Sequence, residues 1–229
     1  MLRRDNYVRA VTVMFIALEL IFFPLIQLLP TRGSAAFSYA SIVCVFLYAL
    51  LTLCTGRDKH LIRLGIFFTL CADYFLVLAC DRQLEGVLCF ICVQACYFLY
   101  LYRVETRACV RRANVVSRIL LSFALITVAY IVLGEDTDVL AIASVIYYGN
   151  LLANIIFAFL RYREEKIFAI GLVLFAMCDL CIGLDVLFDS YLQLDVAGSL
   201  FYSEHHNLPW VFYQPSQLLI GIHLTSNKD

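Results

Sequence analysis

The sequence predicts an all-α protein, a polytopic transmembrane helical bundle of about eight helices. Of its 229 residues, 63% are hydrophobic and 15% are charged, whereas soluble domains average roughly 45–50% apolar and 25% charged residues. Apolar runs long enough to cross a bilayer follow one another along the chain, and basic residues gather in alternate connections between them. Together these three observations exclude a soluble globular domain.

Eight apolar runs account for the predicted helices. A helix needs about 20 apolar residues to cross a hydrocarbon core of about 30 Å. In order, the runs cover residues 8–29, 35–54, 61–79, 86–102, 115–133, 138–160, 167–188 and 208–224. The first run follows Arg3 and Arg4, as in a signal peptide, but it is too long for a signal core and contains Glu19. We therefore expect it to be retained as a helix.

The basic residues orient these helices. One side of the membrane would hold the N-terminus, the loops at 55–63, 103–118 and 161–166, and the C-terminus. Of the 17 Lys and Arg residues, only Arg32 and Arg82 would lie on the other side. Because Lys and Arg concentrate in cytoplasmic loops, both termini are predicted to be cytoplasmic. The opposite side is acidic and the net charge is −1, so we expect no binding to nucleic acid.

Short loops predict a single integral membrane domain over residues 1–229. The longest connection, the basic loop 103–118, divides it into halves of four helices each, at about 1–102 and 115–229. With an even number of spans in each half, a repeat between the halves would be parallel. The third and seventh helices would then run in the same direction.

Each of these two helices carries an aspartate. Asp73 lies in the run 61–79 and Asp179 in the run 167–188, and each follows a glycine, Gly65 or Gly171, by eight residues. A carboxylate at the bilayer centre costs roughly 2.5–3.5 kcal/mol on insertion scales, so an acid within the membrane indicates a functional site. We expect the two aspartates to face a shared interior site.

Further polar residues recur at helical spacing and indicate a polar interior. They are Thr69 one turn before Asp73, Gln94 and Tyr97 on the fourth helix, Tyr147, Asn150 and Asn154 on the sixth, and Tyr213 and Gln217 on the eighth. Such groups also hold membrane helices together through hydrogen bonds of about 0.6 kcal/mol each. A structural interpretation therefore stands beside the functional one for each of them, and for Glu19 on the first helix.

We expect neither a metal nor a cofactor. Most of the ten cysteines fall within the predicted helices, where Cys behaves as a small apolar residue. Glu204, His205 and His206 resemble metal ligands, but they lie in an acidic loop, and four histidines in the whole chain leave few other ligands.

Three segments carry a family resemblance. They are Gly65-Ile-Phe-Phe-Thr-Leu-Cys-Ala-Asp73-Tyr-Phe-Leu76 followed by Gly86, Phe90 and Tyr97; then Gly171, Phe175 and Cys178-Asp179; and finally Tyr213-Gln-Pro-Ser-Gln217-Leu-Leu-Ile220. In this order they resemble motifs of the YhhN family of lysoplasmalogenases. The chain departs from the family pattern at Ala72, Gln94 and Cys178, where the family usually has glycine, histidine and serine.

The resemblance implies an eight-helix fold that hydrolyses the vinyl ether bond of lysoplasmalogens to a fatty aldehyde and a glycerophospho-headgroup product. The partners would be a lysophospholipid-like substrate and the membrane lipids. Protonation of the vinyl ether β-carbon yields an oxocarbenium ion that water captures, so one carboxyl must donate a proton while the other is ionised. Asp73 and Asp179 are the predicted catalytic pair. Residues predicted to position substrate or water are Gln94, Tyr97, Asn154, Tyr213 and Gln217, with Glu19 and Thr69 as further candidates.

A small proton-coupled transporter is the alternative interpretation, and a noncatalytic lipid-binding membrane protein is the third. Transporters often interrupt their helices with Gly or Pro at the binding site. The four prolines, Pro24, Pro30, Pro209 and Pro215, all lie far in sequence from both aspartates. This favours the hydrolase.

Overall fold

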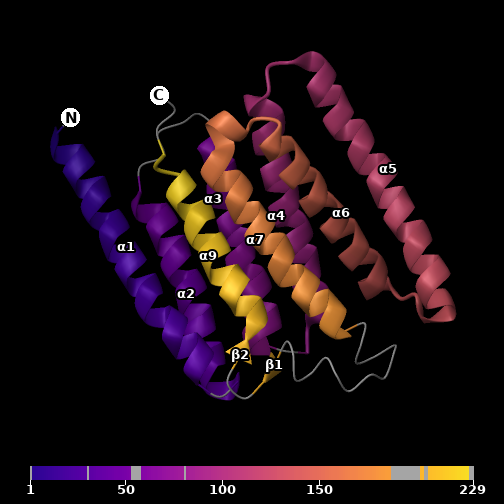
Figure 1. Ribbon diagram of the computed structural model, residues 1–229, viewed down its shortest axis with the longest axis horizontal. Coiled ribbons are helices and arrows are strands. Elements are labelled where there is room, and N and C mark those ends of the chain that lie inside the picture. The colour runs from indigo at the N-terminus through magenta and orange to yellow at the C-terminus, as the bar shows by residue number, and fades with distance from the viewer. Residues whose placement is uncertain are drawn as a thin grey trace.

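The computed structural model describes residues 2–29, 31–52, 58–79, 81–186, 202–203 and 206–226. In this part of the chain, eight long helices run up and down in one bundle, which confirms the predicted helical membrane fold (Figure 1). The helices are α1 (Leu2–Leu28), α2 (Thr31–Leu51), α3 (Lys59–Asp73), α4 (Gln83–Val104), α5 (Ala108–Leu133), α6 (Val139–Phe159), α7 (Tyr162–Val186) and α9 (Leu208–His223).

Helices α1 to α7 are each long and apolar enough to cross a membrane, α3 together with the turn that follows it. The protein is therefore a multi-pass integral membrane protein. The start of α1 and the end of α9 lie at the same end of the bundle (Figure 1). That this end faces the cytoplasm remains a prediction.

Three short elements connect or extend the helices. A π-helical segment, η1 (Tyr74–Ala79), continues α3 directly after Asp73, and such wide turns are frequent at functional sites. A 3-10 turn, η2 (Gly134–Asp136), leads from α5 to α6, and strand β1 (Tyr202–Ser203) pairs antiparallel with β2 (His206–Asn207). Gln27 of α1 exchanges hydrogen bonds of 3.2 and 3.1 Å with the backbone of Asn207, so the start of α9 is anchored to α1.

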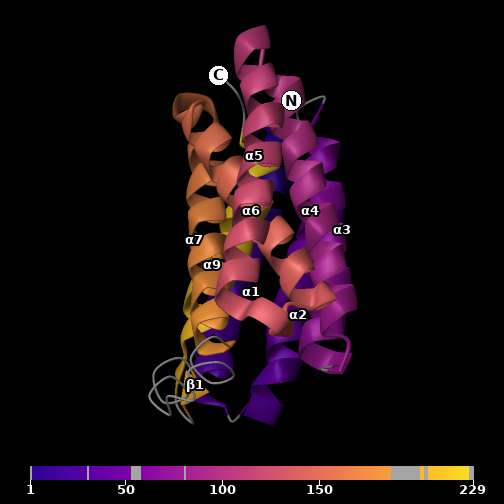
Figure 2. The same cartoon turned by 90° about the vertical axis from the view of Figure 1, so that its right-hand side faces the viewer.

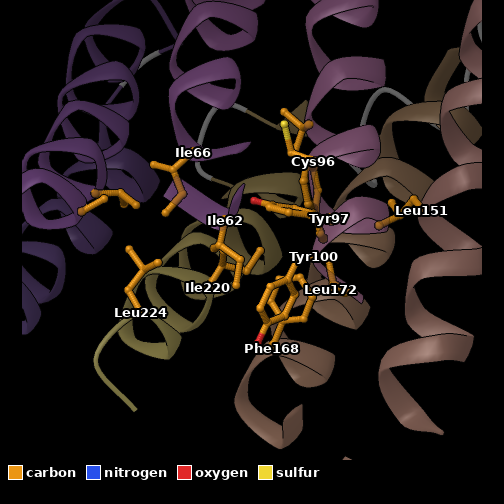
Figure 3. Packing of buried hydrophobic residues seen from close by; sticks show 14 of the residues in the cluster. Ile62, Ile66, Cys96, Tyr97, Tyr100, Leu151, Phe168, Leu172, Ile220 and Leu224 are labelled. Carbon is orange, nitrogen blue, oxygen red and sulfur yellow. The ribbon is translucent and has the colours of Figure 1, made fainter. Parts of the chain in front are cut away.

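The helices that carry the two aspartates lie in opposite parts of the bundle. Figure 2 shows α7 and α9 on one side and α3 and α4 on the other. Gly171 allows the close approach of α7 and α9, because a Cβ there would lie 2.9 Å from Cγ1 of Ile220 and 3.3 Å from the carbonyl oxygen of Ser216. Aliphatic and aromatic side chains, among them Ile62, Tyr97 and Phe168, fill the space between the two parts (Figure 3).

The basic segment predicted as the loop 103–118 is mostly helical. Helix α4 continues to Val104 and α5 already begins at Ala108, so only three residues connect them. The prediction was wrong here because Arg is a good helix former, and a helix can extend beyond its apolar run. Arg118 consequently lies inside α5 with its side chain buried. The proposed division into two halves remains a prediction.

Candidate active site

Asp73 is the last residue of α3 before the π-helical turn, and only 3% of it is exposed. The hydroxyl group of Tyr213, on α9, donates a hydrogen bond of 2.6 Å to its Oδ2 atom. The indole of Trp210, one turn earlier on α9, lies edge-on to the Tyr213 ring at 5.0 Å. This hydrogen bond joins helices from opposite parts of the bundle at the buried acid.

Asp179, on α7, is partly exposed and has a tyrosine partner of its own. The hydroxyl group of Tyr147, on α6, donates a hydrogen bond of 2.5 Å to its Oδ2 atom. Asp73 and Asp179 are close enough for their charges to interact. The structure thus brings together the two aspartates that the sequence singled out, and the four residues Asp73, Tyr213, Asp179 and Tyr147 are called the acid layer below.

Aromatic rings line the acid layer. The ring of Phe175 lies 5.4 Å from that of Tyr213 and 6.5 Å from that of Tyr147. Phe90, on α4, stacks on Tyr147 at 5.4 Å and meets Phe175 edge-on at 5.5 Å. The two aspartate–tyrosine pairs are therefore connected by a continuous aromatic surface.

A second group of polar residues lies about one helical turn nearer to the end of the bundle where α1 begins and α9 ends. Thr69 precedes Asp73 by four residues on α3, Gln94 follows Phe90 by four on α4, and Gln217 follows Tyr213 by four on α9. Tyr97 and Asn154 complete this amide layer, the name used below for Thr69, Gln94, Tyr97, Asn154 and Gln217. All five side chains are fully buried. Together with Tyr213 of the acid layer, they include every residue predicted to position substrate or water except the further candidate Glu19.

The amide layer contains polar atoms without hydrogen bonds in the described part of the chain. They are the Tyr97 hydroxyl, Nε2 of Gln94, and both Nε2 and Oε1 of Gln217. The Tyr97 hydroxyl lies near Thr69 but forms no hydrogen bond of normal geometry, and it points toward α3 and α9 (Figure 3). Because buried polar groups are almost always hydrogen-bonded, these atoms suit a polar ligand.

Asn154 and Gln94 are linked to a residue that sequence reasoning did not select. Asn154 Nδ2 donates to Oε1 of Gln94 at 2.8 Å, while its Oδ1 accepts from Arg118 Nη2 at 2.6 Å. Arg118 was counted among the loop charges, and no local pattern shows that its side chain turns inward. Tyr147 was identified only as one of the polar residues that recur at helical spacing on the sixth helix. Its spacing of two helical turns from Asn154 was the signal that could have made it a candidate site residue.

Glu19 belongs to a different cluster. Its Oε2 atom accepts hydrogen bonds of 2.6 Å from both Ser41 of α2 and Gln214 of α9, and Gln214 also donates to the Glu19 carbonyl oxygen at 2.8 Å. The acid is paired with an amide, as its structural interpretation requires, and it joins three helices. Thr69 donates to the carbonyl oxygen of Gly65 at 3.2 Å within α3.

Another buried cluster lies at the end of the bundle where α3 begins and α9 ends. The Tyr100 hydroxyl donates to Oε2 of Glu165 at 2.8 Å and lies 3.0 Å from Nε2 of His223, which is 3.1 Å from the same carboxylate oxygen. Lys59 donates to the carbonyl oxygen of His223 at 2.8 Å. These contacts join α3, α4, α7 and α9. Sequence reasoning missed the cluster because Glu165 was assigned to a loop.

The described residues contain no group of three potential metal ligands. Of the sequence Glu204-His205-His206, only His206 is within the described part, in β2. Glu204 and His205 lie outside it.

Comparison with known proteins gives one match. The sequence profile of the YhhN family matches residues 33–221, a range that includes the acid layer and the amide layer. No curated protein and no solved structure matches the chain.

Proposed function

We propose that this chain, which belongs to the YhhN family, is a membrane hydrolase that cleaves the vinyl ether bond of lysoplasmalogens. One observation carries the proposal. Two carboxyl groups from distant parts of the sequence, Asp73 and Asp179, lie on either side of the Phe175 ring among the candidate membrane spans, and each accepts a hydrogen bond from a tyrosine that this ring contacts.

The acid layer suits the chemistry of a vinyl ether. One carboxyl group transfers its proton to the β-carbon, and the ether oxygen shares the resulting positive charge as an oxocarbenium ion. The other carboxylate stabilises this cation and takes a proton from the attacking water. The hemiacetal that forms then collapses to a fatty aldehyde and the glycerol hydroxyl. When two carboxyl groups share a low-dielectric site, two like charges there are costly. One group therefore stays protonated while the other is ionised.

The aromatic surface supports the same assignment. Faces of Phe and Tyr rings attract cations, so the rings of Phe90, Phe175 and Tyr147 suit a positively charged intermediate. They also provide an apolar surface for the alkenyl chain.

The test is an aldehyde-release assay on protein in detergent, without any ion gradient. We expect aldehyde from a lysoplasmalogen and no fatty acid from the matching ester lysophospholipid. Release of neither product, by folded protein, would contradict the proposal.

A proton-coupled carrier is the second candidate. The π-helical turn directly after Asp73 favours it, since transporters often place irregular helix segments at their binding sites. A carrier would move substrate or protons across a vesicle membrane without consuming the vinyl ether lipid. The assay in detergent therefore separates the two functions.

A further inference from the structure

A cation lies inside the bundle beside the amide layer. Arg118, on α5, is 7% exposed, and its guanidinium donates to neutral oxygens on three residues. The hydrogen bonds are 2.8 Å to Oδ1 of Asn114, 3.0 Å to Oδ1 of Asn150 and 2.6 Å to Oδ1 of Asn154. It also lies 4.5 Å above the ring of Phe98. Among the described residues, no carboxylate is within ion-pair distance of it.

Arg118 can only donate hydrogen bonds, and this fixes the donors and acceptors of the side chains beyond it. Arg has no acceptor, so Oδ1 of Asn154 must accept and Nδ2 of Asn154 must donate. The acceptors for Nδ2 are Oε1 and the carbonyl oxygen of Gln94, at 2.8 and 3.1 Å. The oxygen and nitrogen of a glutamine amide are often hard to tell apart, but these contacts determine which is which in Gln94. Its Nε2 points onward as a donor, and it is fully buried without a partner in the described part of the chain.

The charge of Arg118 strengthens this terminal donor. Hydrogen bonds in a chain polarise one another, and a low dielectric increases the effect. Since asparagine side chains do not neutralise the guanidinium, the positive potential extends along the chain to Gln94. An uncompensated buried charge is costly, and an anion at the end of the chain would reduce that cost.

The unpartnered donor lies about one helical turn from the aromatic rings that line the acid layer. Gln94 follows Phe90 by one helical turn, about 6 Å along the axis, and Phe90 stacks on Tyr147, which holds Asp179. A lysophospholipid has a matching arrangement, because three glycerol carbons separate its ether oxygen from its phosphate ester.

We propose that Arg118, Asn154 and Gln94 form a relay that binds an anionic phosphate oxygen of the substrate headgroup. The relay makes the enzyme prefer phosphorylated alkenyl lipids over neutral alkenylglycerols. The identity of the lipid rests on the proposed function. Arg118 and Asn154 are positioning residues, and Gln94 contacts the ligand.

Asn114→Asp is the most informative variant. The aspartate oxygen accepts the same hydrogen bond from Arg118 Nε, and it neutralises the guanidinium from the side away from Gln94. The relay keeps its geometry and loses its net charge. Asn114→Ala is the matched control, because it removes the same hydrogen bond without adding a charge.

Binding is measured by the fluorescence of Trp210, which contacts Tyr213 of the acid layer and is the chain's single tryptophan. The probes are a saturated 1-O-alkyl lysophospholipid, which has no vinyl ether to protonate, and the corresponding 1-O-alkylglycerol. We expect wild type to bind the phosphorylated probe about tenfold or more tightly than the alkylglycerol. Asn114→Asp should reduce this affinity ratio by about tenfold, as expected for a hydrogen bond to a charged group. Asn114→Ala and the alkylglycerol affinity should stay near wild type. An unchanged preference in Asn114→Asp, or an equal loss in Asn114→Ala, overturns the proposal.

Hydrolysis distinguishes this inference from the proposed function. On lysoplasmalogen, Asn114→Asp should raise KM and leave kcat near wild type, a split that a general structural defect would not produce. Selective binding of the phosphorylated probe without aldehyde release would contradict the hydrolase and support the anion site. Aldehyde release from lysoplasmalogen and neutral alkenylglycerol at equal KM would support the hydrolase and overturn the anion site.

Discussion

The acids Asp73 and Asp179 occupy different surroundings although the same kind of hydrogen bond holds each. Asp73 is buried beside Tyr213, and Asp179 is partly exposed beside Tyr147. Such a difference between neighbouring carboxyl groups is what acid–base chemistry with two distinct roles requires. Neutral amides suffice to join membrane helices, as Asn154 of α6 does when it donates to Gln94 of α4.

Replacing either acid should strongly slow the reaction and preserve the fold. Asp73→Asn and Asp179→Asn keep the side-chain shape, and an amide is less costly to bury than an ion. Each should lower kcat for vinyl ether hydrolysis by at least about a hundredfold, the low end of general acid–base contributions. Aldehyde release and thermal unfolding in detergent measure the two effects.

Asp138→Asn is the control for this pair of variants. Asp138 caps α6 by accepting from the Ala141 amide at 2.7 Å, and asparagine caps a helix about as well. The rate of vinyl ether hydrolysis and the stability of Asp138→Asn should match those of wild type. An Asn variant at either membrane acid that retains the full rate would remove that acid from the mechanism.

At the scale of helices, close approach between α3 and α4 depends on Gly65. A Cβ at this position would lie 2.4 Å from Cε1 of Tyr97, far inside contact distance. The tyrosine is itself fixed against Phe168 of α7 at 5.2 Å. The glycine therefore sets both the helix spacing and the position of the Tyr97 hydroxyl.

Gly65→Ala should destabilise the protein by about 1–3 kcal/mol, because added volume in a packed core forces side chains or backbone to shift. Gly183→Ala, on α7, is the control, since a Cβ there meets nothing within 4 Å and alanine favours a helix over glycine by up to about 1 kcal/mol. Thermal unfolding in detergent should shift in opposite directions for the two variants. A shift in the same direction would contradict the packing argument.

The connection between α4 and α5 contains a paired acid. Glu105 accepts hydrogen bonds of 3.0 and 2.9 Å from the Arg107 guanidinium, and Arg161 lies 3.8 Å away. The bonded Arg107 side chain lowers the pKa of Glu105 from its ordinary 4.5 to about 2. Since the pKa is lower in the folded state, this stabilisation is present above pH 4.5 and is lost as the pH falls toward 2.

Glu105→Gln should accordingly lower the unfolding temperature at pH 7, and its difference from wild type should shrink steadily between pH 5 and pH 2. Arg107→Gln should show the same pH dependence, because it removes the partner. Thermal unfolding across that range measures both. Equal stability of wild type and Glu105→Gln at pH 7 would contradict this role for the pair.

At the scale of the whole molecule, the start of α1 and the end of α9 lie at one end of the bundle (Figure 1), and the basic residues of the sequence favour the cytoplasm for that end. Reporter tags at the N-terminus and the C-terminus should both be accessible to protease on the cytoplasmic face of sealed membranes and protected from the other face. The loop between α5 and α6 should show the opposite accessibility. Tags on different faces would contradict the orientation.

Local patterns in the sequence were enough to identify the membrane class, the helix order and the two acids. Apolar runs are costly to expose to water, and a carboxylate within such a run is costly to expose to lipid, so the position of both along the chain already indicates their environment. The spacing of four residues likewise placed Thr69 with Asp73 and Gln217 with Tyr213 on common helix faces.

Contacts between distant helices depended on the tertiary structure. The pairing of Tyr213 with Asp73 spans 140 residues, and that of Gln214 with Glu19 spans 195. Helical periodicity shows which side chains share a face, but it does not show which other helix that face meets. The same is true of Arg118, whose charge suggested a loop until its asparagine partners on α5 and α6 showed it to be buried. Partner and burial are properties of the packed bundle, because each depends on side chains that other helices supply.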